Sequence, residues 1–167
     1  PVFPLEWKGE KTTTKGFKEE GYLPEALTNF MAFLGWSPGS EEEVFSLEEL
    51  ATVFNLEKVN SSGAKFDVEK LKWFNHKYLQ LKDNNSLAEY LIEKTTELKD
   101  TNLSLVKKAV GLTKERANSL NEIWPLCSYL FVKPCQYNEK TLIKITSPLT
   151  VKILEELCVE INDIEPF

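Results

Sequence analysis

Most of this chain repeats an apolar residue every three or four positions, and that spacing constrains the fold more than any other feature. The clearest repeat, in residues 23–34, consists of Leu23, Leu27, Phe30, Met31 and Leu34. These positions share one face of an α-helix, because the helix completes a turn every 3.6 residues. No run of alternating apolar and polar residues is long enough to require a large sheet. The sequence therefore predicts an all-α protein with at most short strands.

Residues that favour helix ends indicate where the first helices begin and stop. Pro24 suits the first turn of the first helix, where the missing N–H of proline costs nothing, and Gly35 suits a left-handed stop. Ser46 and Glu49 have the spacing of a capping box, in which each side chain binds the backbone N–H of the other residue. This pair predicts a second helix over residues 46–54.

The middle of the chain continues the helical pattern. Asp67 is expected to cap a helix that runs to about Lys82, because its carboxylate can accept from the free N–H groups of the first turn. The inward residues of this helix are predicted to be Leu71, Phe74, Tyr78 and Leu81. The stretch "KDNN" (82–85) is a candidate hinge, and Ser86 and Glu89 predict a second capping box after it.

The last third of the chain is predicted to be helical too. A short helix over about 102–110 is expected to stop at Gly111, and Thr113 is expected to cap the next helix. Pro125 should kink or split that helix, because it lacks the N–H that an interior hydrogen bond needs. Ser147 predicts the start of a final helix, with a proline in its first turn. We therefore expect two small helical lobes that meet near residues 83–86.

Composition excludes several classes of protein. The net charge of −6 argues against a protein that coats nucleic acid through its overall charge. No apolar run is long enough to cross a bilayer, and we expect no secretory signal. The cysteines, Cys127, Cys135 and Cys158, are odd in number and far apart, so we expect reduced thiols rather than a disulfide framework. The single histidine, His76, is expected to be structural or solvated, because catalytic and metal sites need converging partners.

Two basic islands interrupt this acidic chain. Residues 65–82 carry five lysines and two acids, and residues 94–116 carry six basic groups and three acids, whereas residues 41–57 carry six acids and no base. Arg116 is the only arginine beside nineteen lysines. A guanidinium is a flat fork of donors that can bind a planar partner through two hydrogen bonds, which an ammonium cannot do. The alternative, that the islands and Arg116 are ordinary solvated surface, stays open.

No motif of a self-contained active site is present. The sequence lacks a glycine-rich phosphate loop, a nucleophile elbow and an HExxH metal motif. From the residues alone, the sequence indicates a helical module with two basic islands, no catalytic residue and no metal site.

Several motifs in order resemble one known family. Residues 19–79, with "EGYLPEAL", "LGWSPG", "FSLEEL" and "FDVEKLKWFN", resemble the segment that follows the catalytic domain of bacterial glutamyl-tRNA synthetases, which are class I aminoacyl-tRNA synthetases. The stretch "LVKKAVGLTKERANSLNEIWPLCSYLFVKP" (105–134) is similar to the family's first anticodon-binding helical bundle, and "YNEKT" (137–141) follows in the expected place.

The resemblance implies a domain organisation and a function. It implies an irregular lead-in at 1–16 that belongs to a missing catalytic domain, a stem-contact helical domain at 17–84 and a truncated first anticodon-binding subdomain at 85–167. The parent enzyme would attach glutamate to tRNA-Glu in the cytoplasm with ATP and Mg²⁺. This fragment would bind the tRNA, with no catalytic site or cofactor of its own, and would be inactive by itself. Neither DNA nor a membrane is expected as a partner.

The resemblance also implies anticodon-binding residues. Arg116 aligns with the family arginine that reads the third anticodon base, and Lys107, Lys108 and Lys114 lie on adjacent turns, where they could neutralise loop phosphates. Bases in single-stranded loops are read on their Watson–Crick edges. Cytosine presents the acceptors O2 and N3 there, whereas guanine presents N–H donors. Because glutamate anticodons end in C and glutamine anticodons end in G, one arginine could discriminate between the two tRNAs.

Contacts to the tRNA body are expected on the helix after Asp67. The candidates are Lys70, Lys72, Asn75 and Lys77. The alternatives, that the lysines only solubilise the helix and that Asn75 braces the fold, stay open. The family often has a basic residue where this chain has Gln80, so one phosphate contact is not expected here.

Two further expectations concern partners. An alternative function is a free-standing helical protein-interaction module that uses the acidic surface of residues 41–57. We expect a monomer, with weak association if Leu154, Leu157 and Ile161 form an apolar patch that a truncation leaves uncovered.

Overall fold

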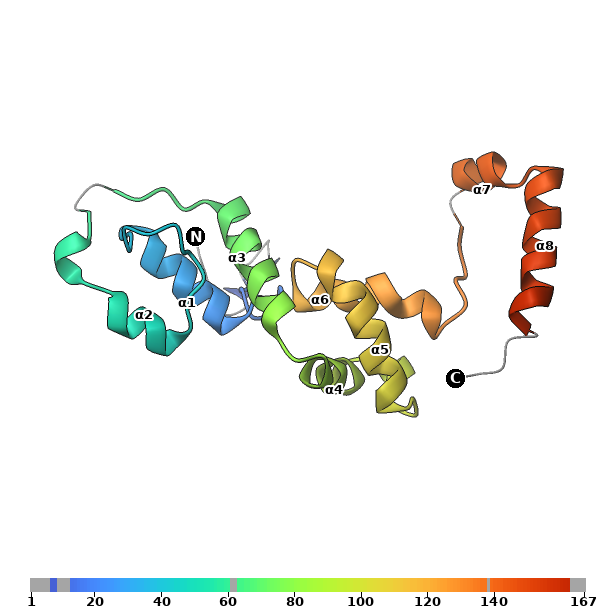
Figure 1. Ribbon diagram of the computed structural model, residues 1–167, viewed down its shortest axis with the longest axis horizontal. Helices are drawn as coiled ribbons and strands as arrows, with labels where there is room; N and C mark the ends of the chain where they lie inside the picture. The colour runs from blue at the N-terminus through green and yellow to red at the C-terminus, as the bar shows by residue number, and fades with distance from the viewer. Residues whose placement is uncertain (1–6, 9–12, 61–62, 138, 163–167) are drawn as a thin grey trace. The chain divides into compact units, whose positions relative to one another are not determined.

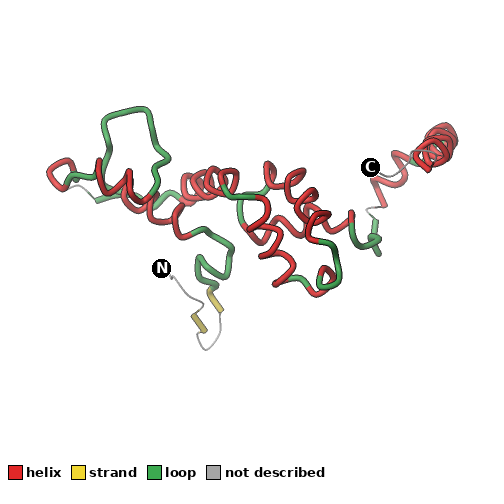
Figure 2. Tube along the Cα trace, turned by 60° about the horizontal axis from the view of Figure 1, so that its bottom comes forward, coloured by secondary structure: helices red, strands yellow, loops and turns green. Residues whose placement is uncertain are grey.

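The computed structural model describes residues 7–8, 13–60, 63–137 and 139–162. The chain divides into two compact units, Pro1–Val132 and Lys133–Phe167 (Figure 1). Apart from one two-residue pairing, the regular structure of the described residues is helical (Figure 2). The strands β1 (Trp7–Lys8) and β2 (Thr13–Thr14) are antiparallel, with Trp7 opposite Thr14. These observations confirm the all-α prediction, short strands included.

The first unit contains six α-helices within its described residues. They are α1 (Pro24–Phe33), α2 (Leu47–Val53), α3 (Val68–Leu81), α4 (Asn84–Lys94), α5 (Leu103–Thr113) and α6 (Leu120–Cys127). Short 3₁₀ turns separate some of them, namely η1 (Leu56–Lys58), η2 (Thr96–Leu98), η3 (Lys114–Arg116) and η4 (Ser128–Leu130). Helix α1 packs against α3, α4 against α5, and α5 against α6.

Several predicted helix starts are confirmed. Pro24 opens α1, and both hydrogen bonds of the Ser46–Glu49 capping box are present at the start of α2. The carboxylate of Asp67 accepts from the backbone N–H groups of the second and third residues of α3. Ser147 Oγ accepts from the N–H of Thr150 at the start of the last helix. In each of these side-chain caps the partner lies within three residues.

Predictions about helix ends were less accurate. Gly35 is not left-handed, and Leu34, the residue that follows α1, has the ordinary right-handed conformation. Gly21 has a φ of +81° instead, and a Cβ at that position would lie 2.8 Å from the backbone N of Asn121. Glycine is required there both by the left-handed backbone and by the close approach of the start of α6.

The predicted second capping box is wrong. Helix α4 begins before Ser86, and Asp83 is its cap, because Asp83 Oδ2 accepts from the N–H of Ser86 at 3.0 Å. Asp83 takes the cap because it stands three residues before Ser86, where its carboxylate reaches the first free N–H groups.

The predicted stop at Gly111 and the predicted cap at Thr113 are also wrong. Helix α5 continues through Gly111, where a Cβ would lie 3.0 Å from Asn84 Nδ2. This glycine therefore permits a close approach of α4 to α5. Thr113 is buried, and its hydroxyl donates to the carbonyl of Ala109 at 2.8 Å instead of capping the next helix. Pro125 lies within α6, which ends at Cys127 and does not split at the proline.

One hydrophobic core joins α1, α3, α4, α5 and α6 of the first unit, and a smaller cluster of Trp36, Phe45 and Leu50 includes α2. The buried side chains of the larger core include Leu71, Phe74 and Leu79 from α3, Leu87 and Leu91 from α4, Val106 and Val110 from α5, and Ile123 and Cys127 from α6. Leu81, predicted to face inward, is 72% exposed, because it is the last residue of α3, where the chain turns toward α4. Met31 is 56% exposed, whereas Phe30 is buried.

The core also shows how the candidate hinge at residues 82–85 relates to the compact units. Only Lys82 and Asp83 separate α3 from α4, and both helices contribute to the same core. The candidate hinge at residues 82–85 therefore does not coincide with the division between the compact units, which follows Val132. The assignment of residues 17–84 to stem contact and 85–167 to anticodon binding stays a prediction.

The second unit has no comparable core among its described residues. It contains α7 (Glu139–Ile145) and α8 (Pro148–Asn162). Leu154, Leu157 and Ile161, which the sequence singled out as a candidate patch, are each about half exposed. Within the described residues, no helix combines the length and the apolar character that crossing a membrane would need.

Candidate nucleic-acid interface

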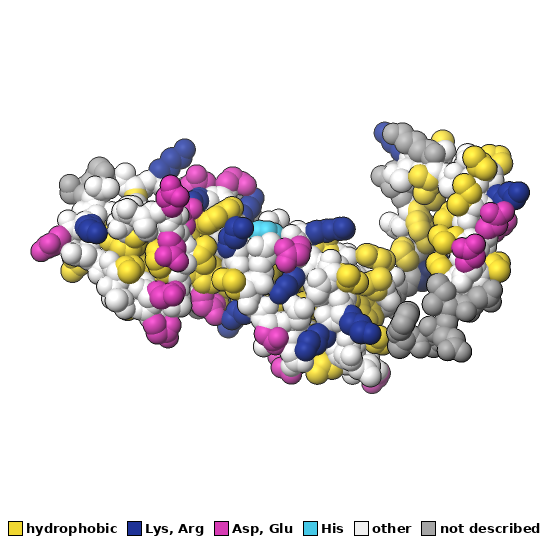
Figure 3. All heavy atoms as spheres, in the orientation of Figure 1, with side chains coloured by type: hydrophobic (Ala, Val, Ile, Leu, Met, Phe, Trp, Pro, Cys, Tyr) yellow, Lys and Arg dark blue, Asp and Glu magenta, His cyan; other side chains and the backbone are white. Residues whose placement is uncertain are grey.

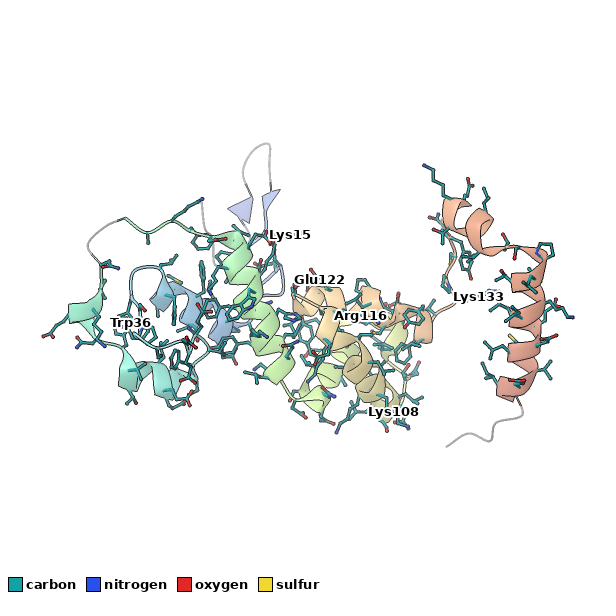
Figure 4. All side chains as sticks on the ribbon, turned by 45° about the horizontal axis from the view of Figure 1, so that its top comes forward. Lys15, Trp36, Lys108, Arg116, Glu122 and Lys133 are labelled. Carbon is teal, nitrogen blue, oxygen red and sulfur yellow. The ribbon has the colours of Figure 1, made fainter. Side chains whose placement is uncertain are left out.

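Arg116 ends the 3₁₀ turn η3, directly after α5 (Figure 4). Its side chain is exposed. Among the described residues, no carboxylate, carbonyl or aromatic ring pairs with its guanidinium. The donors of Arg116 therefore face solvent and are available to a ligand.

The residues on either side of Arg116 are fixed to α3. Lys114 Nζ donates to the carbonyl oxygens of Gln80, at 3.0 Å, and Lys82, at 3.1 Å. These carbonyls belong to the C-terminal end of α3, where backbone acceptors lack helical partners and a positive charge is favourable. Glu115 Oε2 accepts from Gln80 Nε2 at 2.7 Å. The structure thus gives Lys114, a predicted phosphate ligand, another partner inside the chain.

His76 holds the residue that follows Arg116. Its Nδ1 lies 2.8 Å from the carbonyl oxygen of Ala117, and its Nε2 lies 3.0 Å from Gln80 Nε2. A carbonyl can only accept and the Gln80 amide nitrogen can only donate, so these two contacts require a proton on Nδ1 and an acceptor at Nε2. Of the two roles predicted for His76, structural or solvated, these contacts favour the structural one.

Asn75 holds the next residue along. Its Nδ2 donates to the carbonyl oxygen of Asn118 at 2.5 Å, and its Oδ1 accepts from the backbone N–H of Leu23 at 2.7 Å. Asn75 is completely buried. The structure therefore supports the alternative stated for this residue, that it braces the fold, because a buried amide with both ends bonded cannot reach a tRNA.

Lys70 and Lys72, at the start of α3, have acidic partners in the chain. Lys70 Nζ lies 2.5 Å from Glu43 Oε1 and 4.5 Å from the ring centroid of Trp73. Lys72 Nζ lies 2.8 Å from Glu69 Oε1, and this hydrogen bond raises the pKa of Lys72. Each of these charges is thus compensated locally, which weakens its attraction for a phosphate.

Lys77, Lys107 and Lys108 are the predicted lysines that lack such partners. Lys77 Nζ lies 5.8 Å from the ring centroid of Trp73, and Lys107 and Lys108 are exposed on α5. None of the three forms an ion pair with a described residue, although the charge of Lys107 contributes to the lowered pKa of Asp83. Lysine and arginine side chains gather over the middle helices of the first unit in Figure 3. Together with Arg116, these lysines form the candidate interface, defined as Lys77, Lys107, Lys108 and Arg116.

The buried titratable groups outside this interface stabilise the fold. Burial raises the pKa of the Cys127 thiol, and it also raises the pKa of Tyr78. The Tyr78 hydroxyl donates to the carbonyl of Phe45 and lies 2.6 Å from Asn29 Oδ1. Within the ranges that the structure describes, no three His, Cys, Asp or Glu side chains are grouped as metal ligands.

The sequence analysis missed the role of Gln80, which bonds to both His76 and Glu115. One signal was present. His76 and Gln80 are four residues apart and so share a face of α3, and two adjacent polar side chains on a half-buried helix usually have a polar partner. The identity of that partner depends on the fold, because Glu115 lies far along the chain.

The chain was compared with known proteins. Residues 68–167 match the family model described as an anticodon binding domain, and residues 8–73 match that of the class I tRNA synthetase (E and Q) catalytic domain. A glutamate–tRNA ligase from Flavobacterium psychrophilum is 46% identical over the whole chain. The crystal structure of a glutamate tRNA ligase from Elizabethkingia meningosepticum, in complex with its amino acid, covers 99% of the chain with a TM-score of 0.82 and 38% identity.

A second crystal structure, of the glutamate–tRNA synthetase from Elizabethkingia anophelis, also covers 99% of the chain, with a TM-score of 0.79 and 36% identity. The chain spans about a third of the length of these relatives, namely 33% of the Flavobacterium protein and 34% of the Elizabethkingia meningosepticum chain. The two family models meet within α3, in residues 68–73. With relatives this similar along its whole length, the chain belongs to the glutamate–tRNA ligase family of class I tRNA synthetases.

Proposed function

We propose that this chain is a tRNA-binding part of a glutamate–tRNA ligase and that Arg116 reads the third anticodon base of tRNA-Glu. The observation that carries the proposal is the exposed Arg116 side chain, without a partner among the described residues, between neighbours that are bonded to α3. The match of residues 68–167 to an anticodon binding domain supports it. Family membership favours this proposal over the alternative of a free-standing interaction module.

The chemistry of the guanidinium explains the discrimination. Its N–H donors can bind O2 and N3 of a cytosine on the Watson–Crick edge. A guanine in the same place presents the donors N1–H and N2–H₂ beside one acceptor, O6, so the pair of adjacent acceptors is lost and a guanidinium donor is left facing a donor. An unpaired, desolvated donor costs roughly 1–3 kcal/mol, or about 5- to 150-fold in affinity.

Lys77, Lys107 and Lys108 are proposed to neutralise backbone phosphates. Each true contact steepens the dependence of log affinity on log salt by about 0.9 for a duplex and about 0.7 for a single strand. Lys70, Lys72, Lys114 and Asn75 are left out of this interface because each has a partner within the chain.

The parent enzyme is proposed to be cytoplasmic and to couple glutamate to tRNA-Glu with ATP and Mg²⁺. The sequence of this chain contains no glycine-rich phosphate loop. The described side chains offer no metal-binding group either. We therefore assign no step of the reaction to this chain, and its residues bind and orient the tRNA.

The test uses two anticodon stem-loops that differ only in the third anticodon base, C or G. The affinity of the chain for each is measured by NMR titration, which also detects weak binding. We expect tighter binding of the C loop, and we expect Arg116→Gln to make the two affinities equal. The matched control is Lys99→Gln, which removes a positive charge from an exposed residue of the same basic island and should weaken binding of both loops equally. Unchanged preference for C in Arg116→Gln, or no preference in the wild-type chain, would contradict the proposal.

A further inference from the structure

We propose that His76 and Gln80 are positioning residues for Arg116, and that through them α3 fixes the Arg116 turn, residues 114–118, before any RNA binds. This inference deepens the proposed function, and its effect on base discrimination rests on that function. The predicted effect on how well the turn is ordered does not depend on the proposed function.

The contacts of the Arg116 turn follow one pattern. Lys114 donates to carbonyls at the end of α3, and Glu115 accepts from Gln80. The carbonyl oxygens of Ala117 and Asn118 accept from His76 and Asn75. Every residue of the turn except Arg116 is thus bonded to α3, while the Arg116 guanidinium has no bond to the described residues. The turn is held by its other four residues, and Arg116 is presented by them.

Gln80 occupies the central place in this arrangement. Its amide nitrogen carries two hydrogens, one directed to His76 Nε2 and one to Glu115 Oε2. The bond to His76 also fixes the ring tautomer, because it requires an acceptor at Nε2 and leaves the proton on Nδ1 for the carbonyl of Ala117. Loss of the Gln80 amide would therefore release Glu115 directly and free His76 to change tautomer.

His76 and Gln80 differ from Asn75 in what else they hold. Asn75 is fully buried and also binds the backbone of Leu23 at the start of α1, so its loss affects the core. His76 and Gln80 are half-buried, and beyond their bond to each other their side-chain hydrogen bonds go to the Arg116 turn alone, among the described residues. Substitution of Gln80 should therefore loosen the turn and leave the hydrophobic core intact.

A fixed turn affects binding through preorganisation. If the turn moves among several positions, only a fraction of the molecules hold Arg116 where a base edge can meet it, and the apparent affinity falls by that fraction. Ordering one mobile side chain and its loop on binding corresponds to about a 3- to 10-fold loss of affinity. The loss should concern the C loop, because only that loop gains from Arg116.

The experiment compares three variants of the chain. Gln80→Leu removes both hydrogen bonds at similar size, whereas Gln80→Lys restores them, because an ammonium can donate to His76 Nε2 and Glu115 together. Asn85→Leu is the matched control, since it removes a side-chain amide whose one bond among the described residues goes to Glu89 in α4. The readouts are hydrogen exchange of the amides in residues 114–118 of the free chain, and the ratio of the affinities for the C and G loops.

We expect Gln80→Leu to speed exchange in the turn and to lower the C-to-G ratio about 3- to 10-fold, while Gln80→Lys and Asn85→Leu keep both values. Protected amides and an unchanged ratio in Gln80→Leu would overturn the inference. Faster exchange in the turn, combined with no preference for C in the wild-type chain, would uphold the positioning of the turn and refute the proposed function. If Gln80→Leu unfolds the chain, Glu115→Ala, which removes only an exposed acceptor, repeats the test with the same readouts, and an ordered turn there would overturn the inference.

Discussion

The two ends of α3 both carry residues that the sequence marked for RNA binding, yet the structure leaves them in opposite situations. At the first end, Lys70 and Lys72 are paired with Glu43 and Glu69. At the other end, the Arg116 turn is bonded to the helix through its backbone and neighbouring side chains, and Arg116 itself has no partner among the described residues.

The difference shows that a positively charged residue in the sequence is not necessarily free to bind RNA. A lysine that is paired with its own carboxylate must give up that partner to bind a phosphate, so the two contacts partly cancel. A guanidinium without a partner loses only water. The candidate interface is therefore expected to lie at the second end of α3 and on α5.

The largest effect is expected at Asn75, which bonds the Arg116 turn to α3. Asn75→Ala leaves the N–H of Leu23 and the carbonyl of Asn118 without partners, and at about 1–3 kcal/mol for each such buried group we expect a loss of about 3 kcal/mol in the free energy of unfolding. Urea denaturation measures it, with Asn85→Ala as a control at a half-buried amide. A loss below about 1 kcal/mol would mean that Asn75 does not brace the turn.

Paired and unpaired lysines of the same helix can be compared directly. Lys77→Ala should reduce the slope of log affinity against log salt for whole tRNA by about 0.9, the value for one phosphate contact to a duplex. Lys70→Ala should reduce it by less than half as much, because Glu43 already neutralises Lys70. Equal reductions would show that the ion pair opens when RNA binds.

The ion pair of Lys70 can also be broken from the acidic side. Glu43→Gln removes the carboxylate, so Lys70 becomes available, and we expect tRNA affinity at low salt to rise about two- to threefold, a gain that salt screening should abolish. Glu48→Gln on α2 controls for the change in net charge. A similar rise in both variants would indicate general electrostatics rather than release of Lys70.

The smallest expected effect concerns Asp83, the cap of α4 just beyond the second end of α3. The backbone N–H of Ser86 donates to this carboxylate and holds the pKa of Asp83 below its ordinary value of about 4. A lowered pKa in the folded chain means that the stabilisation is present above about pH 4 and is lost as the pH falls through the folded pKa. Asp83→Asn should therefore show a smaller fall in unfolding temperature between about pH 4 and pH 2 than the wild-type chain. Parallel curves for the two proteins would contradict this.

The helix starts that could be predicted from the sequence have local causes. Asp67, Ser46 and Ser147 each cap a backbone group within three residues, so the sequence contains both partners side by side. Ser86 failed as a cap although its pattern was correct, because Asp83 competes for the same helix start.

The remaining features depend on partners that the fold brings together. From the sequence, Gly111 predicts a helix stop. In the structure it lies within α5, and a Cβ at this position would lie 3.0 Å from Asn84 Nδ2. From the sequence, Lys114 is predicted to bind a phosphate. In the structure its Nζ donates to the carbonyl oxygens of Gln80 and Lys82. Arg116 could be singled out by composition alone, but the exposure of its side chain required the structure.

The side-chain signal of Arg116 tests the central claim most directly. Because Arg116 is the only arginine of the chain, its Nε–H gives a single resonance in a ¹⁵N-labelled sample. This resonance should shift on addition of the anticodon loop that ends in C, with a nuclear Overhauser contact to that cytosine, and should shift far less with the loop that ends in G. A resonance that stays in place while amides elsewhere in the chain report binding, or that shifts equally with both loops, would contradict the account.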